Sequence, residues 1–264
     1  MSLLKFASMT CIALTLGACQ SVFQPAVQKP LAFANDASEQ VKAGCTGQDC
    51  PLVNIDTLHF PDAPKLDAMI ENRLLRMTVN SPDDKLAPSL NAYREHFLRT
   101  ADSRNSTYLQ AKVREQHDGL VIVELSSYLD TGGAHGMPGR GFINYSRSQQ
   151  KDVTLQDMLL PGQEQAFWGA AKVAHNNWLI SSHYGSDPEF VKNWPFQKTP
   201  HVALLKDNVV LKYDVYSIAP YSEGHVELKI PYSRLNGILK PEWFPGKGLA
   251  RAVRTPPSPG GRGS

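Results

Sequence analysis

Residues 107–130 constrain the fold most strongly, because they predict a long β-hairpin. In "TYLQAKVREQHDGLVIVELSSYLD" the apolar residues Leu109, Ala111 and Val113 alternate with polar ones, which is the period of a strand with one buried face. The tripeptide HDG predicts the turn, with Gly119 supplying the positive φ that a tight hairpin needs. We therefore expect an antiparallel sheet.

Other segments predict the remaining elements. Alternation of apolar and polar residues predicts strands in 51–60, 208–218 and 225–232, and helical spacing predicts helices in 65–77, 81–100 and 164–180. The apolar face of the last helix is expected to consist of Phe167, Ala170, Ala174 and Trp178. Helices that cluster between antiparallel strands indicate the α+β class, with an antiparallel β-sheet packed against several helices in a single domain.

The N-terminus predicts export and lipidation. Lys5 precedes an apolar stretch, 6–16, that is too short to span a bilayer, and the small residues of "LGAC" resemble the bacterial lipobox. We expect 1–18 to be a signal peptide and Cys19 to carry the lipid that anchors the chain to the membrane. The alternative is an ordinary signal peptide with a chance cysteine. Gln20 indicates the outer membrane, with the protein facing the periplasm of the cell envelope.

Composition divides the rest of the chain into three parts. Residues 19–50 show no sustained periodicity and contain Pro, Gln, Ala and Ser, which predicts a tether. Residues 51–248 hold the periodic segments and form the expected domain. Residues 249–264 are rich in Pro, Gly and Arg and are expected to be disordered. The formal net charge of +2 argues against nucleic acid as a partner.

Two cysteines lie close together in the expected tether. Cys45 and Cys50 form a C-x4-C pair, which in an exported protein predicts a local disulfide. A two-cysteine metal site is the alternative, but no histidine lies nearby at ligand spacing. We expect no metal and no cofactor.

A glycine-rich loop follows the second strand of the hairpin. Its candidate binding residues are Thr131, Gly132, Gly133, Ala134, His135 and Gly136. Three roles are open for it: a tight structural turn in which Gly132 and Gly133 have positive φ, a binding loop, or a catalytic loop. In the catalytic case His135 would be a general base, oriented by Asp130, with the amides of Gly132 and Gly133 as an oxyanion cradle. The sequence contains no G-x-S-x-G and no H-E-x-x-H motif, so we expect a protein that is not an enzyme.

A second candidate segment is "IAPYSEGH". Pro220 cannot donate to a strand ladder, so the hairpin must break there, and Tyr221 then lies at a bend beside Gly224. A tyrosine at such a bend either packs as a corner or contacts a ligand. Because loops on a rigid sheet often carry binding, Pro220, Tyr221 and Gly224 are candidate binding residues.

These motifs resemble a known family. "YLDTGGAHG", "FINYSRSQQKDVTLQDMLLPG" and "YDVYSIAPYSEGHVELKIPYSRL" are similar, in this order, to segments of the RsiV-like domain family. The family comprises the extracytoplasmic domains of anti-sigma factors and of peptidoglycan deacetylases. The chain departs from the usual pattern at Ser146 and at 149–151, where the turn usually contains Gly-Lys.

The resemblance implies a function at the cell envelope. One group of the family binds lysozyme, and the other acts on peptidoglycan. We therefore expect a stand-alone, lipid-anchored binding protein that recognises a lysozyme-type muramidase or peptidoglycan. The alternatives are an enzyme that modifies an envelope polymer through His135, and a structural lipoprotein of outer-membrane assembly.

Overall fold

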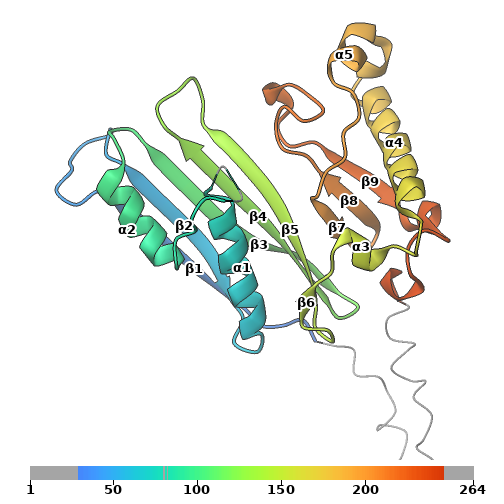
Figure 1. Cartoon of the computed structure of the whole chain (residues 1–264), viewed down its shortest axis with the longest axis horizontal. Helices are drawn as coiled ribbons and strands as arrows, with labels where there is room; N and C mark the ends of the chain where they lie inside the picture. The colour runs from blue at the N-terminus through green and yellow to red at the C-terminus, as the bar shows by residue number, and fades with distance from the viewer. Residues whose placement is uncertain (1–28, 80, 82, 247–264) are drawn as a thin grey trace, which may run out of the picture.

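The computed structural model describes residues 29–246 except 80 and 82, and these residues form two β-sheets (Figure 1). Six strands form the first sheet in chain order: β1 (Ala34–Val41), β2 (Leu52–His59), β3 (Ser106–His117), β4 (Leu120–Asp130), β5 (Met137–Ser146) and β6 (Lys151–Asp152). Three strands form the second sheet: β7 (Val202–Leu204), β8 (Asn208–Lys212) and β9 (Glu227–Pro231). With its helices, this arrangement confirms the α+β class.

Two helices cover one face of the first sheet. The chain passes from β2 through α1 (Pro64–Arg76) and α2 (Leu90–Thr100) to β3 (Figure 1). This crossover lets β2 and β3 pair in parallel, whereas the other neighbouring strands of the sheet are antiparallel. The core between helices and sheet contains Val53, Ile55, Leu66, Ile70, Leu74, Leu109, Ala111, Val121, Val123, Leu125 and Ile143.

The predicted hairpin is confirmed as β3 and β4. Gly119 has a φ of +80° in the turn, and Leu109 and Ala111 are buried. A β-bulge between Val113 and Glu115 shifts the register near the turn. The first four residues of β4 are all buried, because helices cover one face of the strand and the second sheet covers the other.

The second sheet packs against α4 (Glu164–Ser181). The smaller helices are α3 (Leu155–Met158) and α5 (Pro188–Asn193), with 3-10 turns at Tyr184–Ser186, Tyr221–Glu223, Tyr232–Leu235 and Pro241–Trp243. The core between the second sheet and α4 also includes Leu120, Ile122 and Phe142 from the first sheet. The buried amide of Asn144 also joins the sheets: it donates to the Val202 carbonyl and accepts from the Leu204 N–H, both at 2.8 Å.

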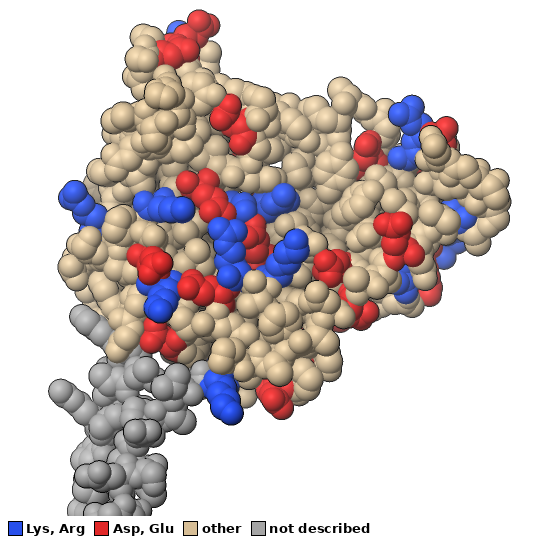
Figure 2. All heavy atoms as spheres, turned by 180° about the vertical axis from the view of Figure 1, so that it is seen from behind, with Lys and Arg blue, Asp and Glu red and all other residues tan. Residues whose placement is uncertain are grey.

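Ion pairs add a second connection between the sheets. Lys212 of β8 pairs with Glu124 of β4 and, at 3.0 Å, with Glu227 of β9. Arg114 of β3 pairs with the same two carboxylates at 2.7 and 3.0 Å. Acidic and basic side chains are interspersed in the middle of the face seen from behind (Figure 2).

Four segments differ from the sequence-based expectation. The strand predicted at 208–218 ends at Lys212. The range 34–41 of the expected tether forms strand β1, whose polar side chains are almost all exposed and so leave no apolar alternation. The second helix begins at Leu90 rather than near residue 81, because the Ser89 hydroxyl caps it by accepting from the Ala92 N–H. In α4 the buried stripe is rotated toward Trp168 and Ala171, which join the core of the second sheet, and leaves Ala170 and Trp178 half-buried.

The predicted disulfide is confirmed. Cys45 and Cys50 are bonded in the connection between β1 and β2. The predicted signal peptide, Cys19 and the whole of the predicted tail, 249–264, lie outside the described residues. Within the described part of the chain, no helix combines the length and apolar character needed to cross a bilayer.

Candidate functional site

The glycine-rich loop connects β4 to β5 and begins with a side-chain turn. The Asp130 carboxylate accepts a hydrogen bond of 2.8 Å from the Gly132 N–H. Gly132 has a φ of +83°, so this position favours glycine. Gly133 is not in the left-handed region, and a Cβ there would meet only the His135 carbonyl, at 4.0 Å. The expectation that Gly133 needs a positive φ is therefore wrong, and Gly132 takes that role.

Gly136 is needed for a different reason. Its N–H donates to the Tyr128 hydroxyl at 3.2 Å, and a Cβ at this position would lie 2.3 Å from Cζ of the same ring. Only glycine permits this approach between the loop backbone and the tyrosine. The interaction fixes the end of the loop over strand β4.

His135 connects the loop to the second sheet. Its Nδ1 lies 3.1 Å from the Gly136 carbonyl, so in the neutral ring Nδ1 carries the proton. Its Nε2 then accepts from the Tyr216 hydroxyl, 3.0 Å away. The imidazole also stacks on Tyr221, with ring centroids 4.0 Å apart and planes at 27°. His135 therefore contacts two residues of the connection between β8 and β9, Tyr216 and Tyr221.

The "IAPYSEGH" segment belongs to the connection between β8 and β9. Pro220 precedes the 3-10 turn Tyr221–Glu223, and Gly224 ends it with a φ of +64°. The Tyr221 hydroxyl donates to the Gly136 carbonyl at 3.3 Å. The two segments singled out in the sequence therefore lie side by side, and their meeting point is His135, Gly136 and Tyr221.

The other predicted binding residues flank this contact. Thr131, Gly133 and Ala134 are exposed on the outer part of the loop, where they present mainly backbone. Tyr216 was missed by sequence reasoning, although its place after the inward Val215 marks it as outward-facing. It is 47% exposed with a φ of +65°. We call His135, Tyr216 and Tyr221 the aromatic junction.

The arrangement of the catalytic alternative, with Asp130 orienting His135, is not formed in the described structure. Asp130 bonds the Gly132 amide, whereas the partners of His135 are Gly136 and Tyr216. The carboxylate therefore does not orient the imidazole, and the Gly132 amide is already occupied. No group of three or more His, Cys, Asp or Glu side chains within the described ranges has the arrangement of a metal site.

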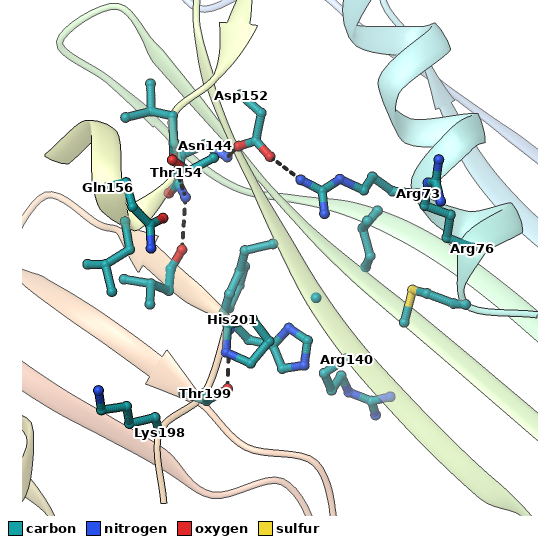
Figure 3. A pocket seen from close by; sticks show the side chains of 18 of the residues that line it. Arg73, Arg76, Arg140, Asn144, Asp152, Thr154, Gln156, Lys198, Thr199 and His201 are labelled. Atoms are coloured by element: carbon teal, nitrogen blue, oxygen red, sulfur yellow. Dashed lines mark hydrogen bonds and ion pairs between the residues drawn. The ribbon is translucent and has the colours of Figure 1, made fainter. Parts of the chain in front are cut away.

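A cavity of about 560 Å³ lies between the two sheets (Figure 3). In the figure Arg73 and Arg76 come from α1 and Arg140 from β5, with Lys198 and Thr199 on the opposite side. Arg73 pairs with Asp152 at 2.6 Å. The cavity is lined mainly by residues of α1, β5, the segment 152–156, α4 and the segment 198–202.

Asp214 connects this cavity to the aromatic junction. Its carboxylate accepts from the Arg140 backbone N–H at 2.8 Å and lies 3.2 Å from Nε2 of His201, which lines the cavity. Burial alone would raise the pKa of Asp214, but the hydrogen bond and charge of His201 hold it below its ordinary value. The ionised carboxylate of Asp214 thus holds both His201 and strand β5. Asp214 precedes Tyr216 by two residues, so this contact lies beside the aromatic junction.

The fold and the junction define an α+β protein with two paired loops at the meeting of its sheets. A family model described as "Protein of unknown function (DUF3298)" matches residues 156–233. The crystal structure of a DUF3298 family protein from Pseudomonas aeruginosa PAO1 is 62% identical to this chain, with a TM-score of 0.81. The match covers 83% of this chain and 99% of that chain. The chain therefore belongs to the DUF3298 family.

A more distant structure shares the fold. The crystal structure of a DUF3298 family member from Bacteroides fragilis NCTC 9343 is 19% identical, with a TM-score of 0.65, and the match covers 84% of this chain and 98% of that chain. A search of curated proteins finds no match.

Proposed function

We propose that this protein is a non-enzymatic binding protein of the cell envelope that recognises peptidoglycan through the aromatic junction. The observation that carries the proposal is the stack of His135 on Tyr221 with the exposed ring of Tyr216 beside it. Two loops from different sheets make this surface together, and each is fixed by hydrogen bonds to the other.

The chemistry of the junction suits a glycan. Aromatic rings offer flat apolar faces to the apolar faces of sugar rings, and tyrosine hydroxyls pair with sugar hydroxyls and acetamido groups. Tyrosine also loses little conformational freedom on binding. The exposed backbone of Thr131, Gly133 and Ala134 adds further hydrogen-bonding groups beside the rings.

Charge favours peptidoglycan over a muramidase as the ligand. The RsiV-like resemblance supports both, but lysozymes are usually basic and an acidic surface would promote their association. The chain has a formal net charge of +2, and the face seen from behind carries both signs interspersed (Figure 2). The muramidase is therefore the second candidate.

Anchoring in the outer membrane by a lipid on Cys19 completes the proposal. It is supported by the lipobox-like residues before that cysteine. Growth with a labelled fatty acid should label the wild-type protein and fail to label Cys19→Ala, which should appear in the soluble periplasmic fraction. Membrane-bound, still-labelled Cys19→Ala would rule out this anchor.

A sedimentation assay tests the ligand. The chain from residue 20 onward should sediment with insoluble peptidoglycan, and Tyr216→Ala and Tyr221→Ala should each weaken binding by about 1–3 kcal/mol. Phe33→Ala is the matched control, because Phe33 is an aromatic residue that is 44% exposed and lies outside the junction.

Three outcomes contradict parts of this proposal. Binding to immobilised lysozyme but not to peptidoglycan would replace the ligand with the muramidase. Turnover of peptidoglycan that is lost in His135→Ala would support the enzyme alternative. Binding to neither ligand would favour the structural role in outer-membrane assembly.

A further inference from the structure

The cavity between the sheets has the size of a small-molecule site. Its volume of about 560 Å³ lies within the roughly 300–1,000 Å³ of most ligand pockets. Phe142 and Trp168 give it apolar walls, and both are largely buried. A ligand that fills it would therefore have an apolar body of several carbon atoms.

The charged side chains that line the cavity are mainly positive. They are Arg73, Arg76, Arg140 and Lys198, against Asp152 and Glu164. Arg73 pairs with Asp152 at 2.6 Å and Lys198 pairs with Glu164 at 3.2 Å. Within the described part of the chain, Arg76 and Arg140 form no ion pair, so the lining has two more positive than negative side chains.

Arg140 is the most buried of these cations. It is half-buried, whereas Arg73, Arg76 and Lys198 are exposed. Among the described residues, its guanidinium donates one hydrogen bond, to the neighbouring Gly139 carbonyl at 2.8 Å. Burial lowers the pKa of Arg140, an effect that the charges of Glu124 and Asp214 only partly offset.

Arg114, a more exposed arginine, shows how this fold pairs a guanidinium beside the junction of the sheets. Its guanidinium donates to Glu124 and Glu227 at 2.7 and 3.0 Å, and the pKa of Arg114 is raised because these pairs outweigh the effect of burial. Among the described residues Arg140 has no carboxylate partner of this kind, and it lines a cavity. A desolvated guanidinium with free donors is a strong binding group for a carboxylate or a phosphate.

We propose that this cavity binds a small organic anion, with Arg140 holding its carboxylate or phosphate group and Phe142 and Trp168 contacting its apolar body. Arg76 contributes a second positive charge that has no ion-pair partner among the described residues. A carboxylate and a phosphate each present two oxygen atoms that can accept the paired hydrogen bonds of a guanidinium group. The site is separate from the aromatic junction and does not depend on its proposed ligand.

Titration with matched probes tests this proposal. The probes are phenylacetate, phenyl phosphate and, as the uncharged control, phenylacetamide, each added to the chain from residue 20 onward at low ionic strength. Calorimetry and thermal melting should show binding of at least one anion with a raised melting temperature, and no binding of phenylacetamide. Preference for phenylacetate or for phenyl phosphate identifies the charged group.

Variants locate the site. Arg140→Gln should weaken binding of the preferred anion at least about tenfold, the effect of losing a charge-assisted hydrogen bond, and should melt no lower than the wild type. Arg76→Gln should weaken binding less. Arg99→Gln is the control, because it removes one exposed arginine outside the cavity.

Two results would overturn the proposal. One is that neither anion binds the wild type more strongly than phenylacetamide does. The other is that Arg140→Gln and Arg76→Gln both bind the anion as the wild type does. If Arg140→Gln fails to fold, its charge is structural, and unchanged binding by Arg76→Gln then suffices to reject the site. Tyr221→Ala should leave anion binding unchanged, which separates this result from that of the glycan assay.

Discussion

The imidazole ring of His135 stacks on the phenol ring of Tyr221, with centroids 4.0 Å apart and planes inclined by 27°. His135 belongs to the β4–β5 loop of the first sheet, and Tyr221 belongs to the β8–β9 connection of the second. This contact makes one surface from two segments that are far apart in the sequence. It also ties the two sheets together at the end where both loops are exposed.

The stack should be measurable as a coupling between the two loops. We expect His135→Ala and Tyr221→Ala to be non-additive, with a coupling free energy of about 0.5–1.5 kcal/mol in a double-mutant cycle, as found for aromatic pairs. Urea unfolding of the wild type, both single variants and the double variant measures it. Additive effects would mean that the loops do not support each other in solution.

Glycine substitutions should separate backbone strain from loop tolerance. Gly132→Val should lower the free energy of unfolding by about 1–2 kcal/mol, because Gly132 has a φ of +83°. Gly133→Val, the matched control, should change it by no more than about 0.5 kcal/mol, since Gly133 is exposed and its φ is outside the left-handed region. Equal losses from both substitutions would contradict the loop geometry.

Gly136→Ala tests the close approach of Tyr128. The new Cβ would lie 2.3 Å from the ring, so the tyrosine or the loop must move. We expect this variant to lose stability and to regain part of it when combined with Tyr128→Ala, which removes the ring. Thermal melts of the single and double variants decide this, and a Gly136→Ala variant as stable as the wild type would disprove the contact.

Local patterns gave the elements that could be predicted. The β3–β4 hairpin follows from alternating residues and one turn glycine, both of which are local. Strand β1 was missed because its residues are exposed on both faces and show no alternation. The parallel pairing of β2 with β3 was also missed, because it depends on where the α1–α2 crossover returns the chain.

The candidate site was predicted only in part, because local patterns do not determine contacts between distant segments. Sequence patterns identified both loops, but their contact depends on how the second sheet packs against β4 and β5. Tyr216 was not among the candidates, because the segment chosen as a candidate, "IAPYSEGH", begins two residues after it. The cations of the cavity come from α1, β5 and residue 198, so no local pattern places Arg140 near Lys198.

The ion pairs between the sheets predict a large effect at Lys212. Its side chain is only 10% exposed and pairs with Glu124 and Glu227. Lys212→Met should lower the free energy of unfolding by about 3 kcal/mol, the lower end for a broken buried pair, because Arg114 still contacts both carboxylates. Lys229→Met on the exposed face of β9 is the control and should have little effect.

The stability lost in Lys212→Met should depend on pH. Burial alone would raise the pKa of Glu124, but Lys212 and Arg114 lower it below its ordinary value of 4.5. A lowered pKa means that the carboxylate stabilises the fold above about pH 4.5 and that this stabilisation is lost as the pH falls. The difference between the wild type and Lys212→Met should therefore shrink in acid. A difference that stays constant down to pH 3 would argue against this cause.

The last prediction concerns the capping box at the start of α3. The Asp157 carboxylate accepts from the Lys151 ammonium at 2.7 Å and from the Thr154 N–H at 2.9 Å, while the Thr154 hydroxyl accepts from the Asp157 N–H. The hydrogen bonds from Lys151 and Thr154 lower the pKa of Asp157 from 3.8 to about 2. Because the folded-state pKa is the lower one, the stabilisation is complete above the unfolded-state pKa and disappears as the pH falls toward 2.

Asp157→Asn should therefore lower the free energy of unfolding by about 1 kcal/mol at neutral pH, the size of a lost cap, and by progressively less between about pH 4 and pH 2. Asp62→Asn, at an exposed aspartate, is the control. Urea unfolding across this pH range measures the difference, and a difference that grows in acid would have the wrong sign for the capping box.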